Sequence, residues 1–148
     1  MAHKALDVAK FIISLSDPEV GDIMTNLKLQ KLLYYVQGFS FAIYNKPIFD
    51  EDIYAWQYGP VVLEVYHQFK NYESGVIPLF IDFDHSIFTS QEKDLITSVY
   101  DVYGQYSAYK LMNMTHQESP WKDTPLNSII THRLLKSHFI HQIEDEEN

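Results

Sequence analysis

Cysteine is absent from the 148-residue chain. Disulfide bonds, thiolate metal sites and a cysteine nucleophile are therefore excluded. Positive charge is also scarce, because 11 lysine and arginine residues stand against 20 aspartate and glutamate residues and give a net charge of −9. Domains that bind duplex nucleic acid present a basic face to the phosphates. We therefore expect no direct nucleic-acid binding by this chain.

Long hydrophobic runs are missing as well, since no apolar stretch approaches the roughly 20 residues that span a bilayer. The first residues, MAHKALDVAKF, carry acidic and basic side chains, unlike a secretory signal peptide. Together with the absence of cysteine, these features predict a cytoplasmic protein that does not enter a membrane.

Glycine is scarce, with five residues scattered along the chain, and the sequence contains no phosphate-binding glycine loop, GxSxG or HExxH motif. His138, His141 and Asp145 could share one face of a terminal helix. Zinc, however, requires three or four converging ligands with supporting hydrogen bonds, and histidine near a helix C-terminus also interacts favourably with the helix dipole. We therefore predict no metal site and no cofactor.

Apolar residues make up 46% of the chain and aromatic residues 15%, which is enough for one domain with a sizeable core. The pattern predicts a single globular, mainly α-helical domain over residues 1–143. Four consecutive acidic residues follow it, and we expect residues 144–148 to form an acidic, frayed tail.

The longest predicted helix begins at Thr25 or Asn26 and runs to Tyr44. It carries apolar residues on two faces, so it should lie at the centre of the domain. Gly38 is expected to be a notch where another element approaches closely, and Asn45 suits the left-handed residue that ends a helix. Further helices are predicted over residues 3–16 and 60–71, from a capping box at Thr89 to about Tyr103, after Ser107, at Ser119-Pro120, and from about Thr131.

A small β-hairpin is predicted after the central helix, with strands at Ile48-Phe49 and at residues 53–56 and an acidic turn between them. Gly59 would then turn the chain, and Pro60 would occupy the first position of the next helix, where a missing N–H costs nothing. The later stretch from Leu79 to His85 fits either a short strand or an extended connection. The fold class is thus mainly α with one inserted hairpin.

Aromatic residues flank the predicted corner at Gly59-Pro60. Trp56 and Tyr58 are expected to pack the hairpin against the central helix, since aromatic residues at corners usually bury most of their surface. Gln30 and Lys31 are polar positions on the otherwise apolar central helix. Either Lys31 extends to water and Gln30 caps a loop, or both contact a partner, because a helix packed on two sides leaves few exposed positions.

His116 and Glu118, in the segment THQESPW, are spaced so that they could form an acid/base pair. Nucleophilic catalysis also requires a third group that orients the base, and the sequence shows none beside them. A small hydrolase or nucleotide-modifying enzyme that uses this pair stays as an alternative to a binding protein.

Two motifs resemble the Panacea domain, also described as the SocA-like or phage-associated GepA-type domain. They are LKLQKLLYY at residues 27–35 and AWQYGPVV at residues 55–62. A later TH…PW segment also resembles the family, and the similarity covers nearly the whole chain, with a variable region at Val76–Ser90. The motif residues that are expected to hold the fold are Leu29, Leu32, Leu33, Tyr34, Trp56, Gly59, Pro60, Val61, Tyr66, Pro120 and Trp121.

The resemblance implies a non-enzymatic interaction domain. Panacea domains resemble antitoxins that neutralise toxins encoded beside them, commonly in prophages, and one type is an adaptor that delivers its toxin to an ATP-dependent protease. Some relatives carry an added helix-turn-helix, and we expect none here, so operator binding is not predicted. The toxin, its mechanism and the oligomeric state stay open. The candidate partner-binding residues are Gln30, Lys31, Gln57, Tyr58, His116 and Glu118.

Overall fold

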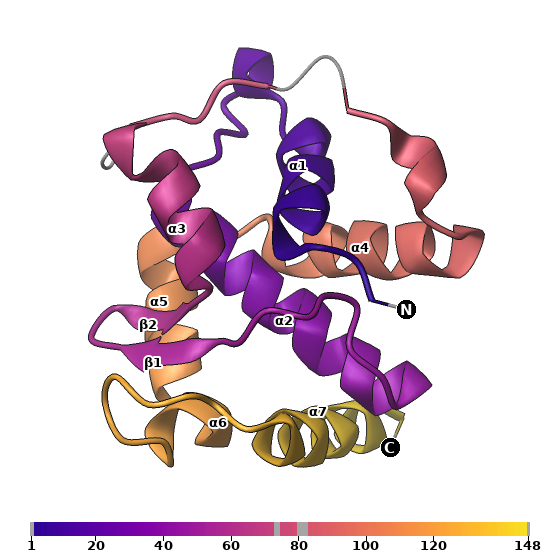
Figure 1. Ribbon diagram of the computed structural model, residues 1–148, viewed down its shortest axis with the longest axis vertical. Helices are drawn as coiled ribbons and strands as arrows, with labels where there is room; N and C mark the ends of the chain where they lie inside the picture. Colours follow the sequence, from indigo (N-terminus) through magenta and orange to yellow (C-terminus); the bar gives the residue numbers. More distant parts are fainter. Residues whose placement is uncertain (1, 73–74, 80–82, 148) are drawn as a thin grey trace.

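The computed structural model describes residues 2–72, 75–79 and 83–147 (Figure 1). Within these residues there are seven α-helices and one two-stranded antiparallel sheet. The prediction of a mainly α-helical fold with one small hairpin is therefore confirmed. The helices are α1 (Ala5–Leu15), α2 (Asn26–Tyr44), α3 (Leu63–Phe69), α4 (Ser90–Tyr103), α5 (Ala108–His116), α6 (Ser119–Lys122) and α7 (His132–Glu147), and short 3-10 turns lie at Pro18–Val20, Lys70–Tyr72 and His85–Ile87.

Helix α2 passes through the middle of the molecule (Figure 1) and contacts α1, α3, α4, α5, α7 and the hairpin. Its side chains from Lys28 to Phe41 are all buried, as expected for a helix with two apolar faces. The Thr25 hydroxyl accepts a hydrogen bond from the Lys28 N–H at its start, and Asn45 ends it with φ 56°. Both predicted ends of the central helix are confirmed.

Gly38 is the notch at which α7 approaches α2. A Cβ at this position would overlap the ring of Phe139, which is fully buried in α7. The ring in turn lies edge-on to Tyr34 and Tyr35 and 4.8 Å from Phe39, measured between ring centroids. The absent side chain of Gly38 therefore lets an aromatic cluster join the two helices.

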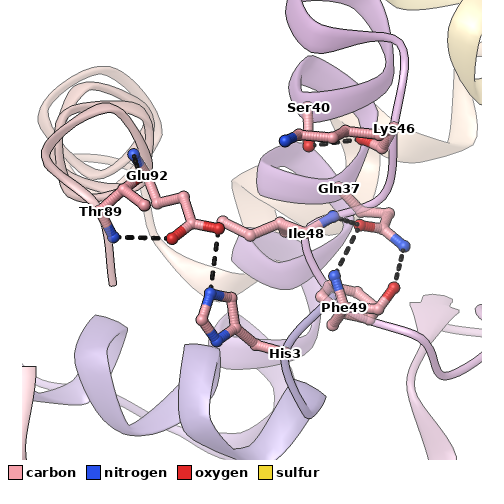
Figure 2. A network of polar contacts seen from close by, with 8 residues as sticks. All are labelled: His3, Gln37, Ser40, Lys46, Ile48, Phe49, Thr89 and Glu92. Carbon is pink, nitrogen blue, oxygen red and sulfur yellow. Dashed lines mark hydrogen bonds and ion pairs between the residues drawn. The ribbon is translucent and has the colours of Figure 1, made fainter. Parts of the chain in front are cut away.

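The hairpin lies one segment later than predicted. Its strands are β1 (Tyr54–Trp56) and β2 (Gly59–Val61), with Trp56 opposite Gly59 and the turn at Gln57-Tyr58. Ile48-Phe49 pairs instead with a side chain of α2: the amide of Gln37 accepts from the Ile48 N–H at 2.9 Å and donates to the Phe49 carbonyl at 2.9 Å (Figure 2). The predicted hairpin strand at Ile48-Phe49 is therefore wrong. Its backbone is satisfied by the buried Gln37 and by a parallel bridge between His3 and Phe49, in which the His3 N–H donates to the Ile48 carbonyl at 2.9 Å.

Pro60 lies in β2 and not at the start of a helix, so the prediction for α3 was also wrong at its first residues. Opposite Pro60, the N–H of Ala55 donates to Ser128 at 3.0 Å and its carbonyl accepts from Asn127 at 2.7 Å. Both polar groups of Ala55 therefore point away from β2, and the position opposite it needs no N–H. A proline is tolerated in this strand for that reason.

Helices α4 and α5 begin at the capping residues that were predicted from the sequence. Thr89 and Glu92 form the capping box of α4, and the Ser107 hydroxyl accepts from the Lys110 N–H at the start of α5. The Glu92 carboxylate also lies 3.0 Å from His3, which ties α4 to the segment before α1 (Figure 2).

Helix α7 extends to Glu147, beyond residue 144, at which the frayed tail was expected to begin. Of the ambiguous stretch from Leu79 to His85, residues 80–82 lie outside the described residues. No helix in the described part of the chain is long and apolar enough to cross a bilayer.

Candidate functional site

The candidate residues of α2 are interior and not exposed. Gln30 is 1% exposed and Lys31 is fully buried, so the expectation that these side chains are exposed is wrong, and so is the alternative that Lys31 extends to water. The Gln30 amide donates to the Asn26 carbonyl oxygen at 2.8 Å and accepts from the Val62 N–H at 2.9 Å. Asn26 donates to the carbonyl of Tyr66 at 3.1 Å. These two amides hold the first turn of α3 against α2.

The buried side chain of Lys31 reaches from α2 to strand β2 of the hairpin. Its Nζ donates to the Pro60 carbonyl at 3.0 Å, and burial lowers the pKa of this amine to about 7. Gly59 lies directly over the lysine stem: a Cβ there would be 2.5 Å from Lys31 Cε and 3.0 Å from Thr115 Oγ1. The φ of Gly59 is 107°, which favours glycine. A buried lysine and a glycine thus fix the position of β2.

The turn of the hairpin is held by the segment between α5 and α6. The Nε2 of His116 lies 3.0 Å from the Gln57 carbonyl, to which it donates, and the His116 ring stacks on Trp121 at 4.1 Å. Trp121 donates its indole N–H to the Trp56 carbonyl at 2.7 Å. The TH…PW segment therefore binds the backbone on both sides of the turn.

The side chains at the turn are exposed. Gln57 is exposed, and Tyr58 keeps 61% of its accessible surface. The prediction that Tyr58 packs against α2 is therefore wrong. Trp56 is half-buried and packs edge-on against Tyr66 of α3 at 5.1 Å between ring centroids. Of the candidate partner-binding residues, Gln57, Tyr58 and His116 lie together at this turn.

Glu118 is engaged with α2 and not with His116. Its two carboxylate oxygens accept hydrogen bonds from the hydroxyls of Tyr34 at 2.9 Å and Tyr35 at 3.0 Å. Burial raises the pKa of Glu118 to about 7, although the two hydrogen bonds favour the ionised form. No hydrogen bond joins His116 to Glu118 in the described structure. The proposed acid/base pair is therefore not assembled.

A groove lies between the hairpin, the start of α2 and α3. We refer to it as the corner groove. It has a volume of about 470 Å³ and is lined by Asn26, Leu27, Gln30, Trp56, Tyr58, Val61, Tyr66 and Lys70. Five of these residues, Gln30, Trp56, Tyr58, Val61 and Tyr66, were named from the sequence, but the groove itself was not predicted. It forms because the buried amides of Asn26 and Gln30 hold α3 beside α2.

The histidines of α7 do not converge with other ligands. His141 donates a ring N–H to the Ser137 carbonyl at 2.7 Å, and the Nε2 of His138 is buried without a partner. Burial, and then the proximity of His141, lower the pKa of His138. Within the described residues no three histidine, aspartate or glutamate side chains are placed to hold one metal ion.

The chain matches a known family. A family model described as "Antitoxin SocA-like, Panacea domain" matches residues 29–122, which include α2 from Leu29 onward, the hairpin, α3, α4, α5 and α6. No curated protein and no solved structure matches the chain.

Proposed function

The chain belongs to the family of antitoxin SocA-like Panacea domains, and we propose that it neutralises a protein toxin encoded by a neighbouring gene by binding that toxin directly. The family match carries this proposal, because it spans the residues that build the hairpin and its supports. Binding would be stoichiometric and would need no cofactor and no turnover.

The hairpin turn is the surface that we propose for the toxin. Its backbone is held by Lys31 from α2 and by His116 and Trp121 from the α5–α6 segment. A rigid support lowers the entropy lost on binding. Tyr58 projects from this support with most of its surface exposed, and tyrosine is enriched among the residues that dominate interface energies.

The enzymatic alternative has less support. His116 uses its Nε2 on the Gln57 carbonyl, and both oxygens of Glu118 are occupied by tyrosine hydroxyls. Glu118 therefore does not orient His116, and the acid/base pair that the enzymatic alternative requires is not assembled. We therefore propose a binding function and assign both residues to positioning the hairpin and the α5–α6 segment.

The first experiment expresses the adjacent gene in cells with and without this protein. Growth arrest by the neighbour alone and growth in the presence of both would support the proposal. Tyr58→Ala should lose the rescue, whereas Tyr109→Ala should keep it, because Tyr109 lies on α5 and is exposed at least as much (70%). Absence of rescue by the unchanged protein would refute the proposed function.

A second arm separates blocking from delivery to an ATP-dependent protease. The amount of the neighbouring protein is followed by immunoblot while both proteins are expressed. Blocking predicts that the toxin accumulates in an inactive complex, whereas an adaptor would make it disappear. Loss of the toxin in normal cells, but not in cells that lack the protease, would identify the adaptor.

A further inference from the structure

The corner groove is preformed by contacts that do not depend on a ligand. The Trp56 ring rests against Tyr66, and its carbonyl is held by Trp121. The Asn26 and Gln30 amides at its floor bond to each other and to the backbone of Tyr66 and Val62. Because these amide groups are already used within the protein, the floor offers mainly apolar contact to a ligand.

The apolar wall of the groove is aromatic. Trp56, Tyr58 and Tyr66 line it together with Leu27 and Val61. Its volume of about 470 Å³ lies within the range of about 300–1,000 Å³ that is usual for binding pockets, so more than one side chain of a partner would fit. Aromatic walls of this kind favour leucine-sized or aromatic side chains.

The charge at the groove is opposite to that of the whole chain. Lys70 is exposed and is the one charged residue among those that line the groove, none of which is acidic. The chain as a whole carries 20 acidic residues against 11 basic ones. Asn26 and Leu27, the first two residues of α2, also lie at the groove, and the start of a helix favours negative charge.

We propose that the corner groove binds a short segment of the toxin in which leucine or phenylalanine lies next to aspartate or glutamate. The apolar side chain contacts Trp56 and Tyr66, and the neighbouring carboxylate faces Lys70. The identity of the partner rests on the function proposed above, whereas the chemistry of the segment follows from the residues of the groove.

Two capped peptides test the chemistry of the groove without the toxin. They are Ac-Gly-Asp-Leu-Phe-Asp-Gly-amide and the same peptide with lysine at both aspartate positions, each titrated to millimolar concentration into the isotope-labelled full chain. In NMR spectra the acidic peptide should shift the Trp56 indole signal and the Tyr66 and Lys70 amides. The lysine peptide should bind at least about tenfold more weakly.

A charge reversal provides the decisive comparison. Lys70→Glu should invert the preference, so that the lysine peptide binds better than the acidic one. Lys110→Glu, at an exposed lysine of α5 outside the groove, should leave the preference unchanged. The proposal is overturned if neither peptide shifts the groove signals, if the two bind equally, or if the shifts lie instead at the smaller groove between α2 and α4, around Ile43 and Val102.

The product of the adjacent gene completes the test. Lys70→Glu should weaken its binding about tenfold, and Lys110→Glu should not, as measured by calorimetry with purified proteins. If the unchanged protein binds and Lys70→Glu binds equally well, the groove proposal is wrong and the proposed function stands. If the unchanged protein does not bind at all, the proposed function is wrong, and the peptide titrations alone decide on the groove.

Discussion

Gly59→Ala tests how closely the hairpin lies on the buried lysine. The φ of Gly59 is 107°, a conformation that residues with a side chain rarely adopt. The added Cβ would also lie 2.5 Å from Lys31 Cε and 3.0 Å from Thr115 Oγ1. The substitution therefore combines backbone strain with overpacking at a fully buried side chain.

Gly21→Ala separates the two costs. Gly21 has φ 84°, and a Cβ there would have no atom within 4 Å. Left-handed backbone costs about 1–2 kcal/mol for a residue with a side chain, and overpacking adds about 1–3 kcal/mol. We therefore expect Gly21→Ala to lower the free energy of unfolding by about 1–2 kcal/mol and Gly59→Ala by about 2–5 kcal/mol.

Urea unfolding followed by far-ultraviolet circular dichroism measures both free energies. A double-mutant cycle with Lys31→Leu, which shortens the side chain under Gly59, should recover part of the loss in Gly59→Ala and none of the loss in Gly21→Ala. Equal losses for the two glycine variants, within about 0.5 kcal/mol, would refute the close approach of Gly59 to Lys31.

Other perturbations test the buried polar groups and the α2–α7 contact. The pKa of Lys31 is lowered to about 7, so between pH 7 and 10 the unfolded chain binds more protons than the folded chain. The free energy of unfolding, relative to that of Lys31→Met, should therefore rise with pH by up to about 1.4 kcal/mol per pH unit. A difference between the two proteins that does not change with pH would contradict this. The pKa of Glu118 is raised to about 7, so between pH 4.5 and 7 the folded chain binds more protons than the unfolded chain. The free energy of unfolding, relative to that of Glu118→Gln, should therefore fall as the pH rises, and urea unfolding at several pH values measures it. Gly38→Ala should cost about 1–3 kcal/mol, because its Cβ overlaps the Phe139 ring; a melting temperature equal to that of the unchanged protein would contradict the overlap.

The features that local chemistry determines could be predicted from the sequence. Helix α2 begins at the Thr25 cap and ends at the left-handed Asn45, and the Thr89–Glu92 box starts α4. Each of these depends on residues within four positions of one another. Periodicity on two faces was also sufficient to place α2 at the centre, because a helix with apolar residues all round must be covered on both sides.

The hairpin could not be placed, because partners far along the chain decide its register. Gln37 binds Ile48-Phe49, and Ser128 binds Ala55. The turn of the hairpin is formed by Gln57 and Tyr58, neither of which is a usual turn residue. Gly59-Pro60 instead fits the common pattern for a helix start, which explains the error at α3.

The main error in predicting the site was to expect the side chains of Gln30 and Lys31 to be exposed, whereas both are buried. A lysine is almost never fully buried without a partner, and the partner of Lys31 is a carbonyl 29 positions later. The position of Tyr58 beside a glycine-proline corner indicated a special geometry, but only the structure shows that its side chain is exposed. The roles of Gln57, Tyr58 and His116 in binding a partner stay predictions.

The most direct test of the central claim is a titration of the purified toxin, the product of the adjacent gene, with this protein and with no protease present. If the protein acts by occupying the toxin, residual toxin activity should fall linearly and reach zero near one subunit of this protein per subunit of toxin. Complete neutralisation far below one equivalent would require turnover and would contradict the account.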